Sequence, residues 1–194
     1  METTRTTAEQ IVDEARRLIM TRGYNGFSYA DIAAAIGIRK ASIHHHFANK
    51  SDLARAVVDQ SRAGIQAQVA LLAEIEPEAG TQIRAYAGYW ERCILDGSAP
   101  FCVAAILAAE MPSLPEAVAA AVRAHFEELK AWLARLLALG VAQDGVSLLR
   151  SPEEEAEAFL SAIYGAMLSA RAFDDPRRFV AIAETLLSRV IRLH

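Results

Sequence analysis

Residues 27–53 of the chain read FSYADIAAAIGIRKASIHHHFANKSDL. Ser28 and the aspartate three residues after it form a capping box, which predicts the start of a short helix. Gly37 ends that helix, because glycine readily adopts the left-handed conformation found after a last helical turn. A second short helix is expected at about residues 39–47. Two short helices joined by a glycine turn are typical of a helix-turn-helix.

Small side chains are expected where these two helices cross. Ala33 and Ala41 have little bulk, so the two backbones can approach closely. The second helix is then free to place its N-terminal end in a DNA major groove, which is just wide enough to accept a helix. The stretch therefore predicts DNA binding, with the second short helix as the reading element.

The rest of the chain carries apolar residues at helical spacing, interrupted by Pro, Gly and acidic stops. Aromatic residues make up only 7% of the chain, and Val, Ile and Thr form no period-2 runs, so helix is favoured over sheet. The sequence predicts an all-α protein. Its other helices are expected at about residues 7–22, 50–74, 81–96, 101–111, 115–139, 152–173 and 176–193.

The charges are unevenly divided. Residues 1–63 hold nine Lys/Arg and seven Asp/Glu, a net +2, whereas residues 64–194 hold eleven and seventeen, a net −6, and together they give the −4 of the whole chain. A mildly basic N-terminal part and an acidic remainder are typical of a protein that contacts DNA at one end. A DNA-packaging protein would be far more basic, so that class is disfavoured.

Cysteine content and apolar runs indicate the compartment. Cys93 and Cys102 do not have zinc-site spacing, and low cysteine usage without a secretory segment predicts a reducing, cytoplasmic location. The longest apolar runs, such as Val103 to Ala109, are too short to span a bilayer, so no membrane partner is expected.

An enzyme is the main alternative class. It would need a nucleophile with a base, a metal cluster or a phosphate loop, and no GxSxG, GxxxxGK or HExxH motif occurs. The histidines at 44–46 invite a metal hypothesis, but consecutive helical residues point about 100° apart, whereas helical ligands are usually spaced i and i+4. We therefore expect no catalysis, no metal and no cofactor.

The helix-turn-helix stretch is similar to the signature of the TetR/AcrR family of repressors, which reads roughly T-x-x-x-I-A-x-x-x-G-V-S-x-x-x-L-Y-x-H-F-x-x-K-x-x-L. The motif covers about the first quarter of the chain, and the rest agrees in length and helical architecture. His44 departs from it, since the family usually has a tyrosine there that contacts a phosphate; histidine can still donate to phosphate, with a dependence on pH. The matching positions are Ile32, Ala33, Gly37, His46, Phe47, Lys50 and Leu53, with close variants at Ser28, Ile38 and Ile43.

The resemblance implies which side chains contact DNA. Lys40 would read a guanine edge and Ala41 would meet a thymine methyl group, with Ser42 beside them at the groove-facing start of the recognition helix. Arg39 would reach either backbone or base. The phosphate contacts that fix the register would come from Ser28, Tyr29, His44, His45, His46 and Lys50.

The resemblance also implies two domains. Residues 1–50 would form a three-helix DNA-binding domain, and residues 51–194 a larger helical domain for ligand sensing and dimerisation, with residues 50–74 as the linking helix. In the family, the last two helices of each chain form the two-fold interface as a four-helix bundle. Here both helices are apolar over more than one face, which packing within the chain explains only in part; the residues are Ala156, Phe159, Leu160, Ile163, Ala166, Met167, Ala170, Phe179, Ile182, Ala183, Leu186 and Val190.

Large side chains of the C-terminal half are mostly core, and the remainder can line a cavity between helices. The cavity would hold a small, mostly apolar effector of unknown identity. Its candidate residues, chosen for size, polar tips and placement, are Tyr89, Trp90, Phe101, Cys102, Phe126, Trp132 and Tyr164.

The expected function is that of a homodimer that binds a palindromic operator in double-stranded DNA and is released by the effector. Repression is expected, although some relatives activate. An alternative trigger is electrophile or oxidant sensing through Cys102, which lies at the expected start of a helix, where a thiolate is stabilised. Some electrophile-sensing members of the family resemble this arrangement. The other reading of Cys102 is an inert, buried small hydrophobe.

Overall fold

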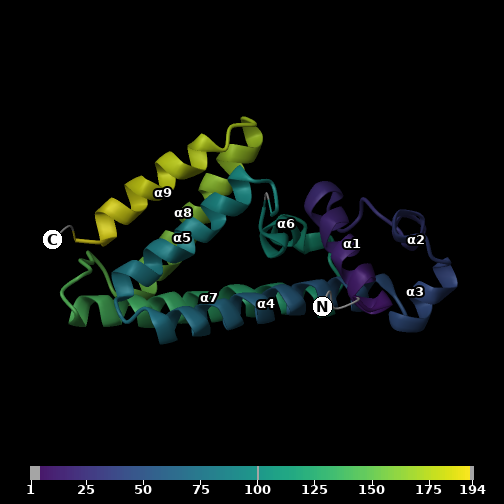
Figure 1. Cartoon of the computed structure of the whole chain (residues 1–194), viewed down its shortest axis with the longest axis horizontal. Coiled ribbons are helices and arrows are strands. Elements are labelled where there is room, and N and C mark those ends of the chain that lie inside the picture. Colours follow the sequence, from purple (N-terminus) through teal and green to yellow (C-terminus); the bar gives the residue numbers. More distant parts are fainter. Residues whose placement is uncertain (1–4, 100, 193–194) are drawn as a thin grey trace. The chain divides into compact units, whose positions relative to one another are not determined.

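The structure is a computed structural model that describes residues 5–99 and 101–192. Its regular secondary structure in that part of the chain is nine α-helices and one 3-10 turn (Figure 1), which confirms the all-α prediction. The helices are α1 (Thr7–Arg22), α2 (Tyr29–Ile36), α3 (Lys40–His46), α4 (Lys50–Ile75), α5 (Ala79–Leu95), α6 (Val103–Ala109), α7 (Glu116–Ala142), α8 (Pro152–Ala172) and α9 (Arg177–Val190), with the 3-10 turn at Met111–Ser113. No described helix is both long enough and apolar enough to cross a membrane.

The chain divides into two compact units. Unit 1 combines the residues up to Gly64 with Cys102–His125, and unit 2 combines Ile65–Phe101 with the residues from Phe126 onward. Two helices, α4 and α7, contribute turns to both units. Unit 1 therefore holds more than the three-helix domain predicted for residues 1–50.

Unit 1 is built around α1, which packs on α2, α3 and α6. The predicted capping box is present: the Asp31 carboxylate accepts hydrogen bonds from the Ser28 backbone N–H over 2.7 Å and from the Ser28 hydroxyl over 2.6 Å. Gly37 ends α2 in the left-handed conformation, with φ of 73°. These two local signals place α2 and α3 as predicted.

One detail of the helix crossing was predicted wrongly. Ala41 is exposed and does not lie between α2 and α3, and Ala33 is only half-buried. The residues buried there are larger, since Ile32 and Ile43 are 0% exposed. The contact between the two helices is thus made by branched side chains and not by the two alanines that were predicted there.

The helix predicted at 101–111 is shorter in the structure. Cys102 is the N-cap of α6, and the helix ends at Ala109. The following residues form the 3-10 turn that contains Pro112. Proline lacks the backbone N–H that a continuing α-helix requires, so the change of helix type at this point has a local cause.

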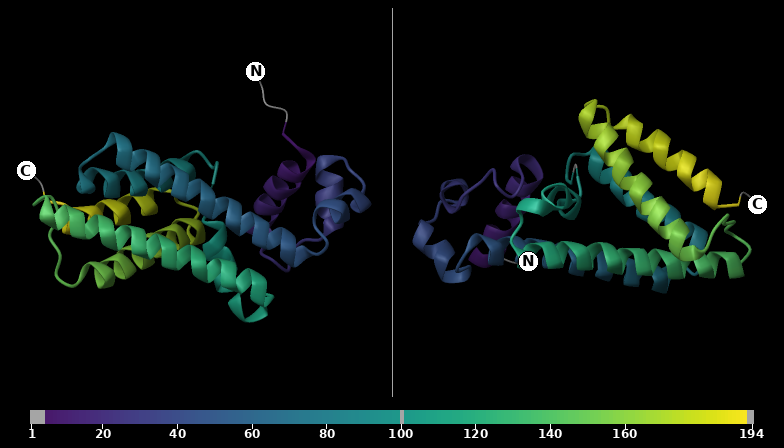
Figure 2. Two further views of the ribbon diagram at one scale, coloured as in Figure 1. Left: turned by 90° about the horizontal axis from the view of Figure 1, so that it is seen from below. Right: turned by 180° about the vertical axis from the view of Figure 1, so that it is seen from behind.

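Unit 2 is a layer of long helices in which α8 and α9 lie side by side and α9 also packs on α5 (Figures 1 and 2). Backbone hydrogen bonds join the end of α9 to the α7–α8 loop: the Ser147 N–H donates to the Val190 carbonyl over 2.9 Å, and the Arg192 N–H to the Gly145 carbonyl over 3.0 Å. The core includes Ile83, Leu133, Leu137, Ile163 and Phe179, all 0% exposed.

Candidate DNA-binding surface and effector cavity

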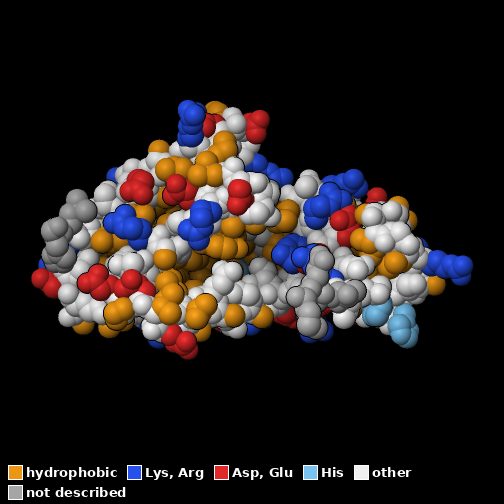
Figure 3. Space-filling model, viewed as in Figure 1, with side chains coloured by type: hydrophobic (Ala, Val, Ile, Leu, Met, Phe, Trp, Pro, Cys, Tyr) orange, Lys and Arg blue, Asp and Glu red, His pale blue; other side chains and the backbone are white. Residues whose placement is uncertain are grey.

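The outer side of α3 is exposed and basic. Lys40 and the three histidines at 44–46 are exposed, as is Arg39 at the N-cap, while Ile43 anchors the inner side. Residues 32–51 contain no Asp or Glu. Figure 3 shows histidine side chains in pale blue over this part of the chain. A hollow of about 560 Å³ borders the helix, lined by Thr7, Ile38, Arg39, Ala41, Ser42, His45 and His46.

Much of the other positive charge of unit 1 is neutralised. The ion pairs are Arg5 and Arg16 with Asp13, Arg17 with Glu14, Arg22 with Asp31, and Arg62 with Asp59. Arg39 and Lys40, by contrast, make no ion pair with any described residue. Arg39 and Lys40 thus place two adjacent positive charges without a carboxylate partner at the start of α3, and Arg55 on α4 is a further exposed cation of unit 1 without a described ion pair.

Tyr29, which was predicted to contact phosphate, is buried and makes its hydrogen bond within unit 1. Its side chain is 6% exposed, and its hydroxyl donates a hydrogen bond to the Phe47 carbonyl over 3.1 Å. Burial raises the pKa of Tyr29 to about 12. The ring lies edge-on to that of His44, with centroids 4.9 Å apart. Tyr29 thus holds the end of α3 and supports His44, and a phosphate would have to compete with the carbonyl for its hydroxyl.

Lys50 is likewise engaged within unit 1. Its ammonium donates to the Phe27 carbonyl and lies over the rings of Phe27 and Tyr24, 4.1 and 4.8 Å from their centroids. Burial lowers the pKa of Lys50, and the charges of Glu110 and Asp31 partly oppose that shift. Cation–π contacts of this kind stabilise a positioned ammonium. The first turn of α4 is thereby held against the segment between α1 and α2.

Glu110 is a residue that the sequence analysis missed. It follows α6, and its carboxylate accepts hydrogen bonds from the backbone N–H groups of Tyr24, over 2.9 Å, and Asn25, over 3.4 Å. A Cβ at Gly23 would lie only 2.0 Å from the same carboxylate, so Glu110 would have to move away, and the positive φ of 74° at this position favours glycine in any case. The end of α6 is in this way hydrogen-bonded to the turn that follows α1.

Cys102 and His125 form a second contact within unit 1. The Cys102 Sγ lies 3.9 Å from the His125 Nε2, and the two residues are 1% and 3% exposed. Cys102 precedes α6 and His125 lies on α7. Sequence reasoning selected the cysteine for its helix position but did not identify the imidazole beside it.

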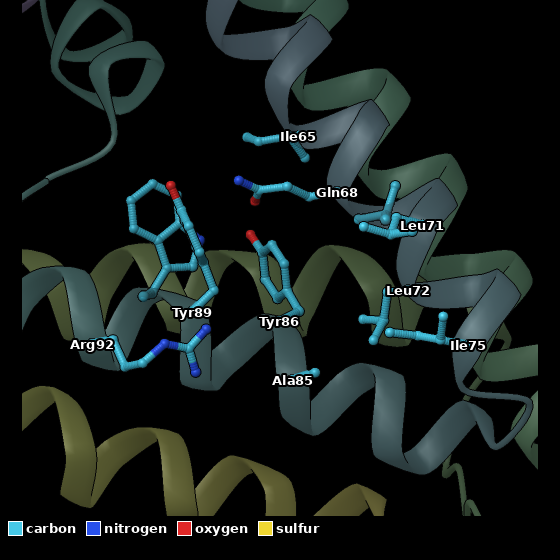
Figure 4. Close-up of a pocket in the computed structure, with 11 residues that line it drawn as sticks. Ile65, Gln68, Leu71, Leu72, Ile75, Ala85, Tyr86, Tyr89 and Arg92 are labelled. Carbon is cyan, nitrogen blue, oxygen red and sulfur yellow. The ribbon is translucent and has the colours of Figure 1, made fainter. Parts of the chain in front are cut away.

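A cavity of about 320 Å³ lies between the second part of α4 and α5, within unit 2 (Figure 4). Of the predicted effector-binding residues, Tyr89 and Trp90 line it. Its wall from α4 was missed, although that wall is apolar at helical spacing. The lining residues are Ile65, Gln68, Val69, Leu71, Leu72, Ile75, Ala85, Tyr86, Tyr89, Trp90 and Arg92.

The other five effector candidates do not line this cavity. Phe126 and Tyr164 pack on each other, with ring centroids 5.2 Å apart, and Trp132 packs on the Tyr86 ring at 5.4 Å. Phe101 is 6% exposed and lies under the Arg171 guanidinium. Cys102 belongs to unit 1, as described above.

The apolar residues predicted for a two-fold interface mostly face the chain's own core. All seven on α8 are at most 5% exposed, as are Phe179 and Ala183 on α9. Instead, the exposed side of α8 carries Ala158, Ser161, Gly165 and Leu168, and Leu168 is 59% exposed. A Cβ at Gly165 would meet no atom of the chain within 4 Å. This glycine is therefore not required by packing within the chain.

No group of three or more His, Cys, Asp or Glu side chains that could hold a metal ion occurs among the described residues. The three adjacent histidines do not form such a group: the rings of His45 and His46 contact each other edge-on, with centroids 5.4 Å apart, and the ring of His44 packs on Tyr29.

Comparison with known proteins covers both halves of the chain. The family model for bacterial regulatory proteins of the tetR family matches residues 11–57, and the model for the tetracyclin repressor-like C-terminal domain matches residues 79–186. The crystal structure of a TetR-family transcriptional regulator from Agrobacterium tumefaciens is 48% identical, with 95% of this chain and 97% of that chain covered and a TM-score of 0.93. The reduced form of NemR from E. coli shares the fold at 20% identity, with coverages of 96% and 98% and a TM-score of 0.83.

A curated relative is similar over the N-terminal region alone. IcaR from Staphylococcus epidermidis, the negative transcriptional regulator of the biofilm operon icaADBC, is 35% identical over 51 residues. The match covers 26% of this chain and 28% of IcaR. The chain thus matches little more than a quarter of the length of that relative.

Proposed function

The chain belongs to the TetR family of bacterial regulatory proteins, and on that premise we propose that it is a dimeric repressor that binds a palindromic operator through α3 and leaves it when a small, mostly apolar effector binds unit 2. The observation that carries the proposal is the exposed positive charge of Arg39 and Lys40, which make no ion pair with a described residue and lie at the start of a helix that carries no carboxylate of its own. Members of this family regulate transcription by binding DNA and are not enzymes.

The proposed base contacts lie at the start of α3. Lys40 reads a guanine edge, while Ala41 and Ser42 approach neighbouring bases, because a helix enters the major groove by its N-terminal residues. The same hollow is lined by three further exposed side chains, those of Arg39, His45 and His46.

The remaining predicted residues, Ser28, Tyr29, His44 and Lys50, contribute phosphate contacts or hold α3 in register. Tyr29 mainly holds the end of α3, since its hydroxyl already bonds to the Phe47 carbonyl. Lys50 mainly holds the first turn of α4 against the segment between α1 and α2, since its ammonium bonds to the Phe27 carbonyl. His44 is exposed and packs on Tyr29. It replaces the usual tyrosine as the phosphate donor of the helix.

Dimerisation is proposed through α8 and α9, with the exposed side of α8 at the two-fold axis. Glycine inside a helix costs about 1 kcal/mol relative to alanine, and Gly165 has open space around it within its own chain. A second chain packed closely at Gly165, with Leu168 one turn further on, would account for both residues.

Release of DNA is proposed to pass through α6. Glu110 bonds the end of this helix to the turn after α1, so a shift of α6 moves the backbone that positions α2 and α3. A ligand changes DNA affinity only to the extent that it binds the two conformations differently, typically by 1–3 kcal/mol.

Glu110→Gln tests this connection. Glutamine keeps the size but loses the charge that strengthens the hydrogen bonds to Tyr24 and Asn25. We expect faster hydrogen exchange at those two amides and a free energy of unfolding lower by roughly 1–2 kcal/mol. Glu116→Gln is the control, since Glu116 is exposed and pairs only with Arg123 among the described residues. Unchanged exchange at Tyr24 in Glu110→Gln would contradict the role of Glu110.

A second candidate trigger is the thiol of Cys102, favoured by the imidazole 3.9 Å away. An imidazole beside a thiol can take its proton, which activates the sulfur as a nucleophile. Addition of the thiolate to an electrophilic carbon–carbon double bond would form a sulfur–carbon bond, break the π bond and return the proton to the neighbouring carbon. The adduct would enlarge a residue that is 1% exposed, which would displace the start of α6.

Operator DNA selected from a random pool separates the two triggers. N-ethylmaleimide is added to the DNA complex of the wild type, of Cys102→Ser and of Cys93→Ser, which removes the other buried cysteine. The thiol mechanism predicts release from the wild type and Cys93→Ser but not from Cys102→Ser. Release from all three, or from none, leaves the cavity as the only trigger.

A further inference from the structure

The cavity between α4 and α5 has a chemical character that restricts its ligand. Its volume of about 320 Å³ is at the small end of the range for ligand sites. Most of the wall is aliphatic or aromatic, with Leu72 and Ile75 of α4 on the side of the Tyr86 ring and Tyr89 beyond that ring (Figure 4). A compact apolar body, preferably a flat ring system, fits such a wall.

One polar group of the wall lacks a partner. Trp90 is 5% exposed, and its indole N–H is buried without a hydrogen-bond acceptor among the described residues. A buried N–H is normally paired, because leaving it unpaired is unfavourable. Indole nitrogen is only a donor, so the partner that a ligand brings to Trp90 must be an acceptor, such as an oxygen.

The charge of the cavity wall further restricts which ligands can bind. Arg92 is the only charged side chain that lines it, and no acidic residue does so among the described ones. Three aromatic residues could otherwise suit a quaternary ammonium through cation–π contacts. The guanidinium repels such a cation and favours an anion.

We propose that this cavity binds a compact aromatic carboxylate, with its ring among Tyr86, Tyr89 and Trp90. A carboxylate oxygen accepts the hydrogen bond of the Trp90 indole N–H, which is covered in the empty cavity and becomes accessible when the side chains around it shift on binding. Arg92, exposed at the mouth, attracts the negative charge. The inference rests on the proposed function for its regulatory meaning, because the cavity is taken as the effector site, but ligand binding itself can be measured without DNA.

The test is calorimetric titration of the full-length protein with benzoate, cinnamate, indole-3-acetate and 2-naphthoate. Each is paired with the corresponding primary alcohol, and phenyltrimethylammonium is the cationic comparison. We expect at least one carboxylate to bind more tightly than its alcohol and than the cation. Trp90→Phe keeps the apolar wall without the N–H and should weaken that carboxylate at least fivefold, and Arg92→Gln should weaken it as well.

Trp132→Phe is the matched control, because Trp132 packs on Tyr86 but does not line the cavity. The affinity of this variant for the carboxylate should stay within twofold of that of the wild type. Melting curves show whether each variant is folded. The proposal is overturned if no carboxylate binds, if the cation or the alcohols bind best, or if Trp90→Phe binds as the wild type does. If the carboxylate binds as expected but leaves operator affinity unchanged, the ligand class stands and effector-induced release is wrong.

Discussion

Leu168→Glu is expected to turn the dimer into monomers and to weaken operator binding by roughly 10²–10⁴-fold, because the second half-site contact becomes a separate bimolecular event. Leu168 is exposed on α8 in the single chain, so a glutamate there does not disturb the chain's own core. At a helix–helix interface the same carboxylate would lose its hydration without gaining a partner.

Leu149→Glu is the matched control. Leu149 is 95% exposed in the loop between α7 and α8, so the same substitution there should leave the dimer and its DNA affinity unchanged. Light scattering at micromolar concentration reports the mass, and circular dichroism reports the helix content. A wild type that is monomeric, or a Leu168→Glu variant that remains dimeric with full affinity, would exclude α8 as the interface.

Lys40→Ala is expected to weaken operator binding by about 1–3 kcal/mol, roughly 5- to 150-fold, and to relax specificity at one position in each half-site. Lys40 is exposed in the first turn of α3 and makes no described ion pair, so its removal should cost no fold stability. The loss comes from a missing base contact and should be small on random DNA.

Arg135→Ala removes the same charge from an exposed position on α7 in unit 2 and should change neither affinity nor specificity. Fluorescence anisotropy with operator and scrambled duplexes, at several salt concentrations, measures both. Equal losses on the two duplexes for Lys40→Ala would remove Lys40 from base reading and leave it as a phosphate contact.

Local signals in the sequence were sufficient to place most helices. Each signal involves only a few neighbouring residues. Examples are the capping box at Ser28, the left-handed glycine at Gly37 and the helix cap at Asn49, whose side chain accepts a hydrogen bond from the Asp52 N–H over 2.9 Å. Contacts between distant segments carry no such signal. Glu110 reaches Tyr24 across 86 positions, and nothing near either residue indicates it.

The spacing of apolar residues also does not say what an apolar helix face packs against. It identified apolar residues such as Ala166 on α8 but could not say whether they meet their own chain or a second one, and Ala166 is 1% exposed. For the cavity, Tyr89 and Trp90 were found by size. Ile65 and Leu72 also have apolar helical spacing, but spacing alone does not distinguish a cavity wall from a packed face.

Recognition of a two-fold symmetric DNA site by α3 is tested by selecting bound sequences from a pool of random duplexes with the purified full-length protein, followed by sequencing. We expect enrichment of a palindrome, with half-sites one helical turn or a modest multiple apart, and loss of information at one position per half-site for Lys40→Ala. No enriched sequence, or an enriched site without two-fold symmetry, would contradict it.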